Sequence, residues 1–178
     1  MTLIELVVVM VLVALLLGIG IPSFKSVTTS SRISGESNAL LGDLQYARSE
    51  AVREGSPVTV CVSKTGTSCD NASDTWQEGW IVFSDVNDDQ TVDPGDTVLR
   101  VQSPFPSTDP DSFTSPAGDY AVTFTREGFA YTGAGGMIVT LHNEPDNTYN
   151  SYYTRCVELS QAGMMSVQSH STDAAGCT

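Results

Sequence analysis

The chain has 178 residues, of which 40% are hydrophobic, and a formal net charge of −13. This length is typical of one domain with an appendage. Residues 25–54 hold four basic and four acidic side chains, whereas residues 55–178 hold four basic and sixteen acidic ones, a net charge of −12. Such an acidic globular part disfavours binding to nucleic acid or anionic lipid and favours cations.

Residues 1–24 are predicted to form a hydrophobic transmembrane or assembly helix. Residues 3–22 are almost all Leu, Val, Ile, Ala, Gly or Met, and about 20 such residues at 1.5 Å per residue match the hydrocarbon core of a membrane. A signal peptide would need a basic start and a small-residue cleavage site, but no base precedes Lys25 and no such site follows the run. The segment is therefore expected to be retained as a single-pass anchor.

Glu5 is the one acid within this apolar run. A carboxylate within a membrane helix costs about 2.5–3.5 kcal/mol on insertion scales, so it indicates either a partner or a function. The alternative is an acid that lies near the membrane interface and is partly hydrated.

Residues 25–54 are predicted to continue the helix, with a kink near residues 18–22 at Pro22. Apolar residues recur at spacings of three or four, so they define one buried stripe. Asp43 is within reach of Arg48 on the charged face, and Gly55-Ser56-Pro57 ends the helix near residue 54. The stripe comprises Ile33, Leu40, Leu41, Leu44, Ala47, Ala51 and Val52.

After residue 55 the apolar period changes to two, which is typical of strands. Residues 103–119 are rich in Pro, Ser and Asp and are predicted to form a surface loop. The predicted fold class is therefore α+β, with one long N-terminal helix packed on an antiparallel β-sheet domain at residues 55–178. The predicted strands are 57–63, 76–84, 97–103, 120–126, 137–143, 152–160 and a short 164–168.

The four cysteines, Cys61, Cys69, Cys156 and Cys177, form no CxxC pair. An even number of cysteines behind a membrane-spanning start favours two disulfides in an oxidising compartment, although buried free thiols are an alternative. Of the three pairings, Cys61–Cys69 and Cys156–Cys177 are preferred because each closes a loop-like segment.

The segment 85–96 is rich in acids, with oxygen-bearing side chains at alternate positions much like a calcium loop. Against calcium, Gln90 stands where such loops have Gly, and no helix precedes the segment. The alternative is a polar connection built on Asx turns, and no other cofactor is predicted. The candidate ligands are Asp85, Asn87, Asp89, Thr91, Asp93 and Asp96.

No catalytic set is recognisable. His142 and His170 are isolated, and no GxSxG, P-loop or HExxH motif occurs. The sequence therefore does not indicate an enzyme, and a membrane-anchored enzyme is the weakest alternative.

The N-terminus resembles that of mature type IV pilins and type II secretion pseudopilins, through Met1–Leu6, the apolar run and Ile21–Phe24. This resemblance implies that a prepilin peptidase removes a short basic leader before Met1 and methylates the Met1 amine. In an apolar filament core, that amine and Glu5 of a neighbouring subunit neutralise each other, and their pairing sets the axial register.

A second resemblance, to the GspH/FimT family of minor pilins and pseudopilins, rests on residues 38–54, strand 57–63, Gly79–Phe83 and Asp96–Arg100. It implies a long helix packed on antiparallel sheet. Some members bind DNA at a C-terminal Gly-Arg-x-Arg-like turn, but this chain has Gln161-Ala162-Gly163-Met164-Met165 there. DNA binding is therefore not expected.

These resemblances imply a structural minor pilin that helps to initiate or cap a type IV pilus. A minor pseudopilin of a type II secretion system and a DNA-binding competence pilin are the alternatives. The implied partners are other minor pilins, the major pilin, an inner-membrane assembly platform and, before assembly, membrane lipid. The chain is expected in the inner membrane with its globular part in the periplasm, and in the pilus or pseudopilus after assembly.

Overall fold

The computed structural model describes residues 2–106, 111–115, 119–132, 136–143 and 153–169, without the side chains of residues 19–23, 138, 142 and 143. The chain divides into two compact units, residues 1–32 and 33–178. One helix, α1 (Leu3–Glu54), supplies the first unit and the beginning of the second. The predicted helix at about residues 2–54 is confirmed, whereas the kink near Pro22 stays a prediction.

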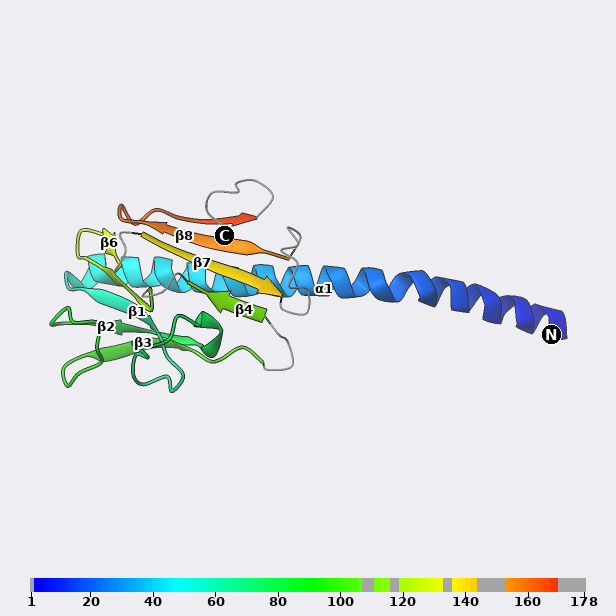
Figure 1. Ribbon diagram of the computed structural model, residues 1–178, viewed down its shortest axis with the longest axis horizontal. Coiled ribbons are helices and arrows are strands. Elements are labelled where there is room, and N and C mark those ends of the chain that lie inside the picture. The colour runs from blue at the N-terminus through cyan, green and yellow to red at the C-terminus, as the bar shows by residue number, and fades with distance from the viewer. Residues whose placement is uncertain (1, 107–110, 116–118, 133–135, 144–152, 170–178) are drawn as a thin grey trace. The chain divides into compact units, whose positions relative to one another are not determined.

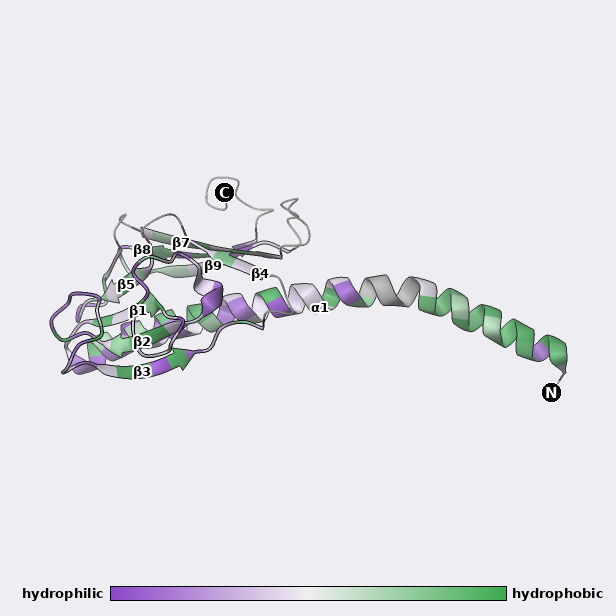
Figure 2. Ribbon diagram, turned by 60° about the horizontal axis from the view of Figure 1, so that its bottom comes forward, coloured by the Kyte–Doolittle hydropathy of each residue, from purple (hydrophilic) through white to green (hydrophobic). Residues whose placement is uncertain are grey.

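The first unit is hydrophobic over most of its helical surface, as the colouring of the N-terminal part of α1 in Figure 2 shows. The large apolar side chains that the structure describes in this unit are exposed, from 47% for Val7 to 84% for Leu3. No helix in the part of the chain that the structure describes combines enough length and apolarity to cross a membrane.

In the second unit, α1 buries a stripe of small and branched side chains. The stripe includes Ser37 and not the predicted Leu41. The Ser37 hydroxyl can be buried because it donates to the Ile33 carbonyl at 2.8 Å. Val52 is 54% exposed, so its predicted place in the stripe was wrong. The helix ends at Gly55, whose φ of +69° is the left-handed conformation that glycine adopts at this position without strain. The buried positions are Ile33, Ser37, Leu40, Leu44, Ala47 and Ala51.

Two antiparallel sheets complete this unit (Figure 1). The first has the order β3-β2-β1-β5-β6 and the second the order β4-β7-β8-β9. A short 3-10 helix, η1 (Trp76–Glu78), precedes β2. The strands of the first sheet are β1 (Val58–Val62), β2 (Trp80–Ser84), β3 (Thr97–Gln102), β5 (Ala121–Phe124) and β6 (Ala130–Tyr131). Those of the second are β4 (Asp111–Thr114), β7 (Gly136–Asn143), β8 (Arg155–Ser160) and β9 (Met165–Ser169).

The main core contains side chains of α1 and of both sheets. In β1, Val58, Val60 and Val62 face this core, because alternate residues of a strand point to opposite faces. Cys61 belongs to a second, smaller cluster on the other face of the same sheet. The first sheet is therefore covered on both faces, which accounts for a strand that is buried at every position.

The prediction of a surface loop at 103–119 was wrong for residues 111–114, which form β4 and pair with β7. Phe113 is fully buried and stacks on Phe105, so the segment contributes to the core in spite of its polar composition. The predicted strand 76–84 begins only at Trp80. The two-residue strand β6 was not predicted, since two residues carry no periodicity.

Candidate functional site

The N-terminal candidate pair is only half described, because Met1 lies outside the described residues. Glu5 is exposed, and its Oε2 accepts a hydrogen bond from the Thr2 backbone N–H at 3.3 Å. Thr2 precedes the helix and Glu5 is its third residue, which is the spacing of a capping box. Within one chain, then, Glu5 satisfies a helix-start donor, and its pairing with a neighbour's amine stays a prediction.

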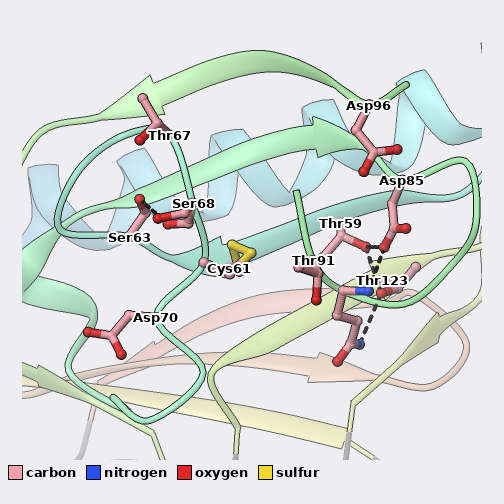
Figure 3. The surroundings of a disulfide bond; sticks show 12 residues. Thr59, Cys61, Ser63, Thr67, Ser68, Asp70, Asp85, Thr91, Asp96 and Thr123 are labelled. Carbon is pink, nitrogen blue, oxygen red and sulfur yellow. Dashed lines mark hydrogen bonds between the residues drawn. A yellow bond between two sulfur atoms is a disulfide. The ribbon is translucent and has the colours of Figure 1, made fainter. Parts of the chain in front are cut away.

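The disulfide Cys61–Cys69 is present, so this predicted pairing is confirmed. It ties the loop after β1 to the outer face of the first sheet (Figure 3). Within this loop the Ser63 hydroxyl donates to the Ser68 carbonyl at 2.7 Å. Cys156 is buried on β8, but Cys177 lies outside the described residues, so the pairing of these two stays a prediction.

The acidic loop, which is the segment 85–96, covers the same outer face of the first sheet, beside the disulfide (Figure 3). Asp85 is fully buried, and its carboxylate accepts hydrogen bonds from the backbone N–H groups of Asp89 and Gln90 at 3.1 and 3.0 Å. It also accepts the hydroxyl of Thr59 on β1 at 2.7 Å. The Gln90 side chain donates to Thr123 on β5 at 3.0 Å. Asp85 therefore organises the loop and fixes it to the sheet.

Asp89 and Asp96 are also engaged by donors of the loop itself. Asp96 accepts the backbone N–H groups of Val86 and Asp93 at 3.0 and 2.9 Å. Asp89 accepts the Thr91 N–H at 2.8 Å, which closes an Asx turn, and also the Asn87 amide at 2.9 Å. These contacts have the geometry of the Asx-turn alternative.

Among the described residues, no three His, Cys, Asp or Glu side chains are grouped so that they could hold a metal ion. The six candidate ligands are thus brought together in one loop but not into one coordination sphere. Calcium binding stays the less favoured of the two sequence-based predictions for this loop, beside the connection built on Asx turns. His142 has no described side chain, and His170 lies outside the described residues.

Tyr131 on β6, the register partner of Thr123, also holds the acidic loop. Its hydroxyl donates to the Asp88 carboxylate. Burial, together with this hydrogen bond, raises the pKa of Tyr131 to about 12. The phenol therefore stays protonated, and remains a donor, at every physiological pH.

The predicted contact between Asp43 and Arg48 does not form. Asp43 instead accepts Trp80 Nε1 and Arg100 Nη1, each at 2.9 Å. Arg48 donates from Nε to the Gly128 carbonyl and from Nη1 to the Gly163 carbonyl, each at 3.0 Å. Residues five apart do not lie on one face of a helix, and strand and turn residues distant in sequence supply the partners instead.

Comparison with solved structures shows a pilin-like fold. The crystal structure of the Pseudomonas aeruginosa type IV minor pilin FimU matches with a TM-score of 0.62 at 19% identity, over 83% of this chain and 96% of that one. A second crystal form of FimU matches with a TM-score of 0.56 at 20% identity, over 83% and 99%. The minor pseudopilin EpsH of the Vibrio cholerae type 2 secretion system gives 0.46 at 9% identity, over 76% and 95%.

The fold is pilin-like, with a long helix packed on antiparallel sheet. Residues 36–163 match the family model of the type II transport protein GspH. This match covers more than half of the chain, and the chain belongs to the GspH family. No curated protein sequence matches it.

Proposed function

We propose that this chain is a structural minor pilin, not an enzyme, and that it helps to initiate or cap assembly of a type IV pilus. The observation that carries the proposal is the apolar helical segment of the first unit, with Glu5 in its first turn. Large apolar side chains that are 47% exposed or more along a helical segment need cover from lipid or from neighbouring helices. Membership of the GspH family and the likeness in fold to FimU, a type IV minor pilin, support the same function.

The partners follow from this role. Before assembly, membrane lipid covers the segment 1–24, and a prepilin peptidase acts at Met1. During assembly the apolar segments of other minor pilins and of the major pilin replace the lipid, with an inner-membrane platform delivering subunits. The acidic globular part then lies in the periplasm or in the filament, where two disulfides are stable.

A minor pseudopilin of a type II secretion system is the second candidate, and the description of the matching family as type II transport proteins favours it. The two candidates share the same physics but serve different machines. Deleting the gene distinguishes them, because loss of surface pili with normal secretion supports the pilus, whereas retention of exoproteins in the periplasm supports the pseudopilus.

The test of the filament role uses two substitutions of Glu5. Glu5→Gln keeps an acceptor for the Thr2 N–H, because Gln also serves in a capping box, but it removes the charge. Glu5→Ala removes both. If charge pairing with a neighbour's amine drives assembly, both variants reach the membrane and both enter filaments about tenfold less than the unmodified chain, since an unpaired charge would be left in an apolar core.

The measurement is the amount of tagged full-length chain in sheared filaments relative to that in membranes. Normal incorporation of Glu5→Gln alongside a defect in Glu5→Ala would assign Glu5 to helix capping instead. Normal incorporation of both would defeat the pairing argument altogether.

A further inference from the structure

Arg48 differs in its acceptors from four other basic side chains of the second unit, whereas Arg155 also donates to a backbone carbonyl, that of Thr154. Arg53, Lys64, Arg100 and Arg126 each lie within 3.4 Å of a carboxylate oxygen. Arg48 has backbone carbonyls as its acceptors among the described residues. Its positive charge is therefore fixed in position without a carboxylate in contact, in a domain whose net charge is strongly negative.

The site around Arg48 is built for this side chain. The carbonyls that hold Arg48 come from two turns, one between β5 and β6 and one between β8 and β9. Gly163 has φ +72°, and a Cβ there would lie 2.3 Å from the Gly128 carbonyl oxygen and 3.0 Å from Arg48 Nε. A Cβ on Gly128, with φ +83°, would lie 3.1 Å from the same nitrogen. Any larger residue at Gly163 would displace the guanidinium.

One edge of the guanidinium remains available. Nε and Nη1 are engaged by the two carbonyls, whereas Nη2 has no acceptor among the described residues. The N–H groups of Nη2 can donate a charge-assisted hydrogen bond to a carboxylate oxygen. Arg48 is half-buried, so little side-chain entropy would be lost when this edge binds an anion.

Arg48 lies in a hollow of about 840 Å³ that opens to solvent, here named the Arg48 hollow, with α1 on one side and the two turns on the other. Apolar side chains form much of its wall, and two of them are well exposed, Val52 at 54% and Met164 at 69%. Glu127 also lines the hollow, but its carboxylate accepts Arg126 Nε at 2.7 Å. The hollow thus combines one fixed cation with an apolar rim.

We propose that the Arg48 hollow binds an acidic segment of a different filament subunit, with one carboxylate on Arg48 and a flanking apolar side chain against Val52 and Met164. Charge complementarity carries this choice of partner. Arg48 attracts a single carboxylate placed next to it. A polyanion such as nucleic acid would instead be repelled by the net charge of −12 on residues 55–178. The proposal rests on the proposed function for the existence of such a subunit.

The test places a negative, a neutral or a positive side chain at one exposed position without touching the Arg48 contacts. Met164→Glu, Met164→Gln and Met164→Lys are made in the full chain, and each variant is first checked for an unchanged unfolding midpoint. We expect Met164→Glu to lower recovery with sheared filaments about tenfold relative to Met164→Gln, because like charges in contact across an interface are costly. Met164→Lys should match or exceed Met164→Gln.

A carbodiimide applied to cells that carry Met164→Lys joins the new amine to a carboxylate within bonding reach. We expect a cross-linked peptide that contains an Asp or Glu of another pilin-like subunit. Val101→Lys on β3, where Val101 is 54% exposed, is the matched control and should not give that peptide.

The outcomes separate this proposal from the proposed function. Wild-type chain that never copurifies with filament subunits overturns both. Normal incorporation that is insensitive to the charge at residue 164 overturns the Arg48 hollow alone, as does equal loss with Glu and Lys, which indicates an apolar partner. A cross-link to a second copy of this chain, or to no acidic residue, also overturns it.

Discussion

Asp119 has a side chain that the fold buries at a cost. The residue is 1% exposed, and its Oδ1 has no hydrogen-bond partner among the described residues. Its backbone carbonyl, in contrast, accepts the Ser115 hydroxyl at 2.7 Å, and Ser115 in turn accepts Trp76 Nε1 at 3.1 Å. The backbone is thus held in place by the core tryptophan, and the carboxylate is buried as a consequence.

Burial raises the pKa of Asp119, because an unpaired charge is disfavoured away from water. The folded state therefore binds the proton more tightly than the unfolded state, and stability falls as the pH rises through the folded-state pKa. Asp119→Ala should raise the free energy of unfolding at pH 7 by about 1 kcal/mol, the cost of an unsatisfied buried polar group. The gain should shrink below the ordinary Asp pKa of about 3.9.

Urea unfolding of the full chain at neutral and acidic pH measures this effect. Asp74→Ala serves as the control, since Asp74 is less buried than Asp119. A loss of stability for Asp119→Ala at neutral pH would mean that the carboxylate has a favourable partner.

At the level of single residues, the sequence predicted types of environment better than it predicted partners. The stripe at Leu40, Leu44, Ala47 and Ala51 follows from helical period alone, and it is buried. Arg48 could not be placed in this way, because its acceptors lie 80 and 115 residues away on turns that only the tertiary fold brings to the helix. The one local signal was Gly128 and Gly163, two glycines at turn positions in an otherwise β-rich region.

Among the elements, the disulfide loop after β1 offers a direct stability test. Cys61 is fully buried on the central strand, and Cys69 lies eight residues on in the loop. A bridge over so short a loop should stabilise the fold by about 2–3 kcal/mol through the entropy of the unfolded chain. The double variant Cys61→Ala/Cys69→Ala, with Cys156 and Cys177 unchanged, should therefore have a free energy of unfolding lower by that amount. It should unfold at a lower denaturant concentration.

The contacts Lys64–Glu78 and Lys64–Asp70 also hold this loop, at 2.9 and 3.4 Å. Lys64→Met is a matched control for these exposed ion pairs and should lower stability much less than loss of the bridge, because solvent screens them. An unfolding midpoint that the double cysteine variant leaves unchanged would show that the loop is ordered without its bridge.

The acidic loop provides the second test at this scale. Its carboxylates accept backbone N–H groups, so a calcium ion would have to displace hydrogen bonds at Asp85, Asp89 and Asp96. We therefore expect the same melting temperature in millimolar calcium and in chelator. A ligand that bound only the folded state would raise the melting temperature, because its binding adds to the free energy of unfolding. A clear rise with calcium, absent from Asp89→Asn, would show that the loop rearranges around the ion.

The strands were predictable where their apolar residues alternate, and β4 was not, because only Phe113 marks it between polar neighbours. Its burial depends on pairing with β7, on stacking with Phe105 and on an edge contact with Trp80. The oxygen pattern of the acidic loop was visible in the sequence, but the direction in which each carboxylate points was not. Asp85 directs its oxygens into N–H groups four and five residues on, a choice that the buried neighbour Thr59 fixes.

At the scale of the whole molecule, the composition alone distinguishes an apolar N-terminal segment from an acidic remainder. Apolar side chains dominate the N-terminal part of the first unit (Figure 2), whereas residues 55–178 hold sixteen acidic and four basic side chains. Period and composition therefore predicted one helix and an antiparallel β domain, which the fold confirms. One sheet or two were both compatible with the sequence, and the strand order within the two sheets could not be predicted, because it depends on contacts distant in sequence.

The net charge of −13 predicts that the full chain does not bind duplex DNA, since phosphate contacts supply nearly all non-specific affinity. The turn at Gly163-Met164-Met165-Ser166 lacks the arginines of the Gly-Arg-x-Arg pattern. Fluorescence anisotropy with a labelled duplex should show no saturable binding at about 50 mM salt, where electrostatic binding is strong. The variant Met164→Arg/Ser166→Arg restores the pattern, and two phosphate contacts would give it weak binding with a slope of about −2 in log affinity against log salt. Saturable, salt-sensitive binding by the unmodified chain would contradict this prediction and revive the DNA-binding pilin as its function.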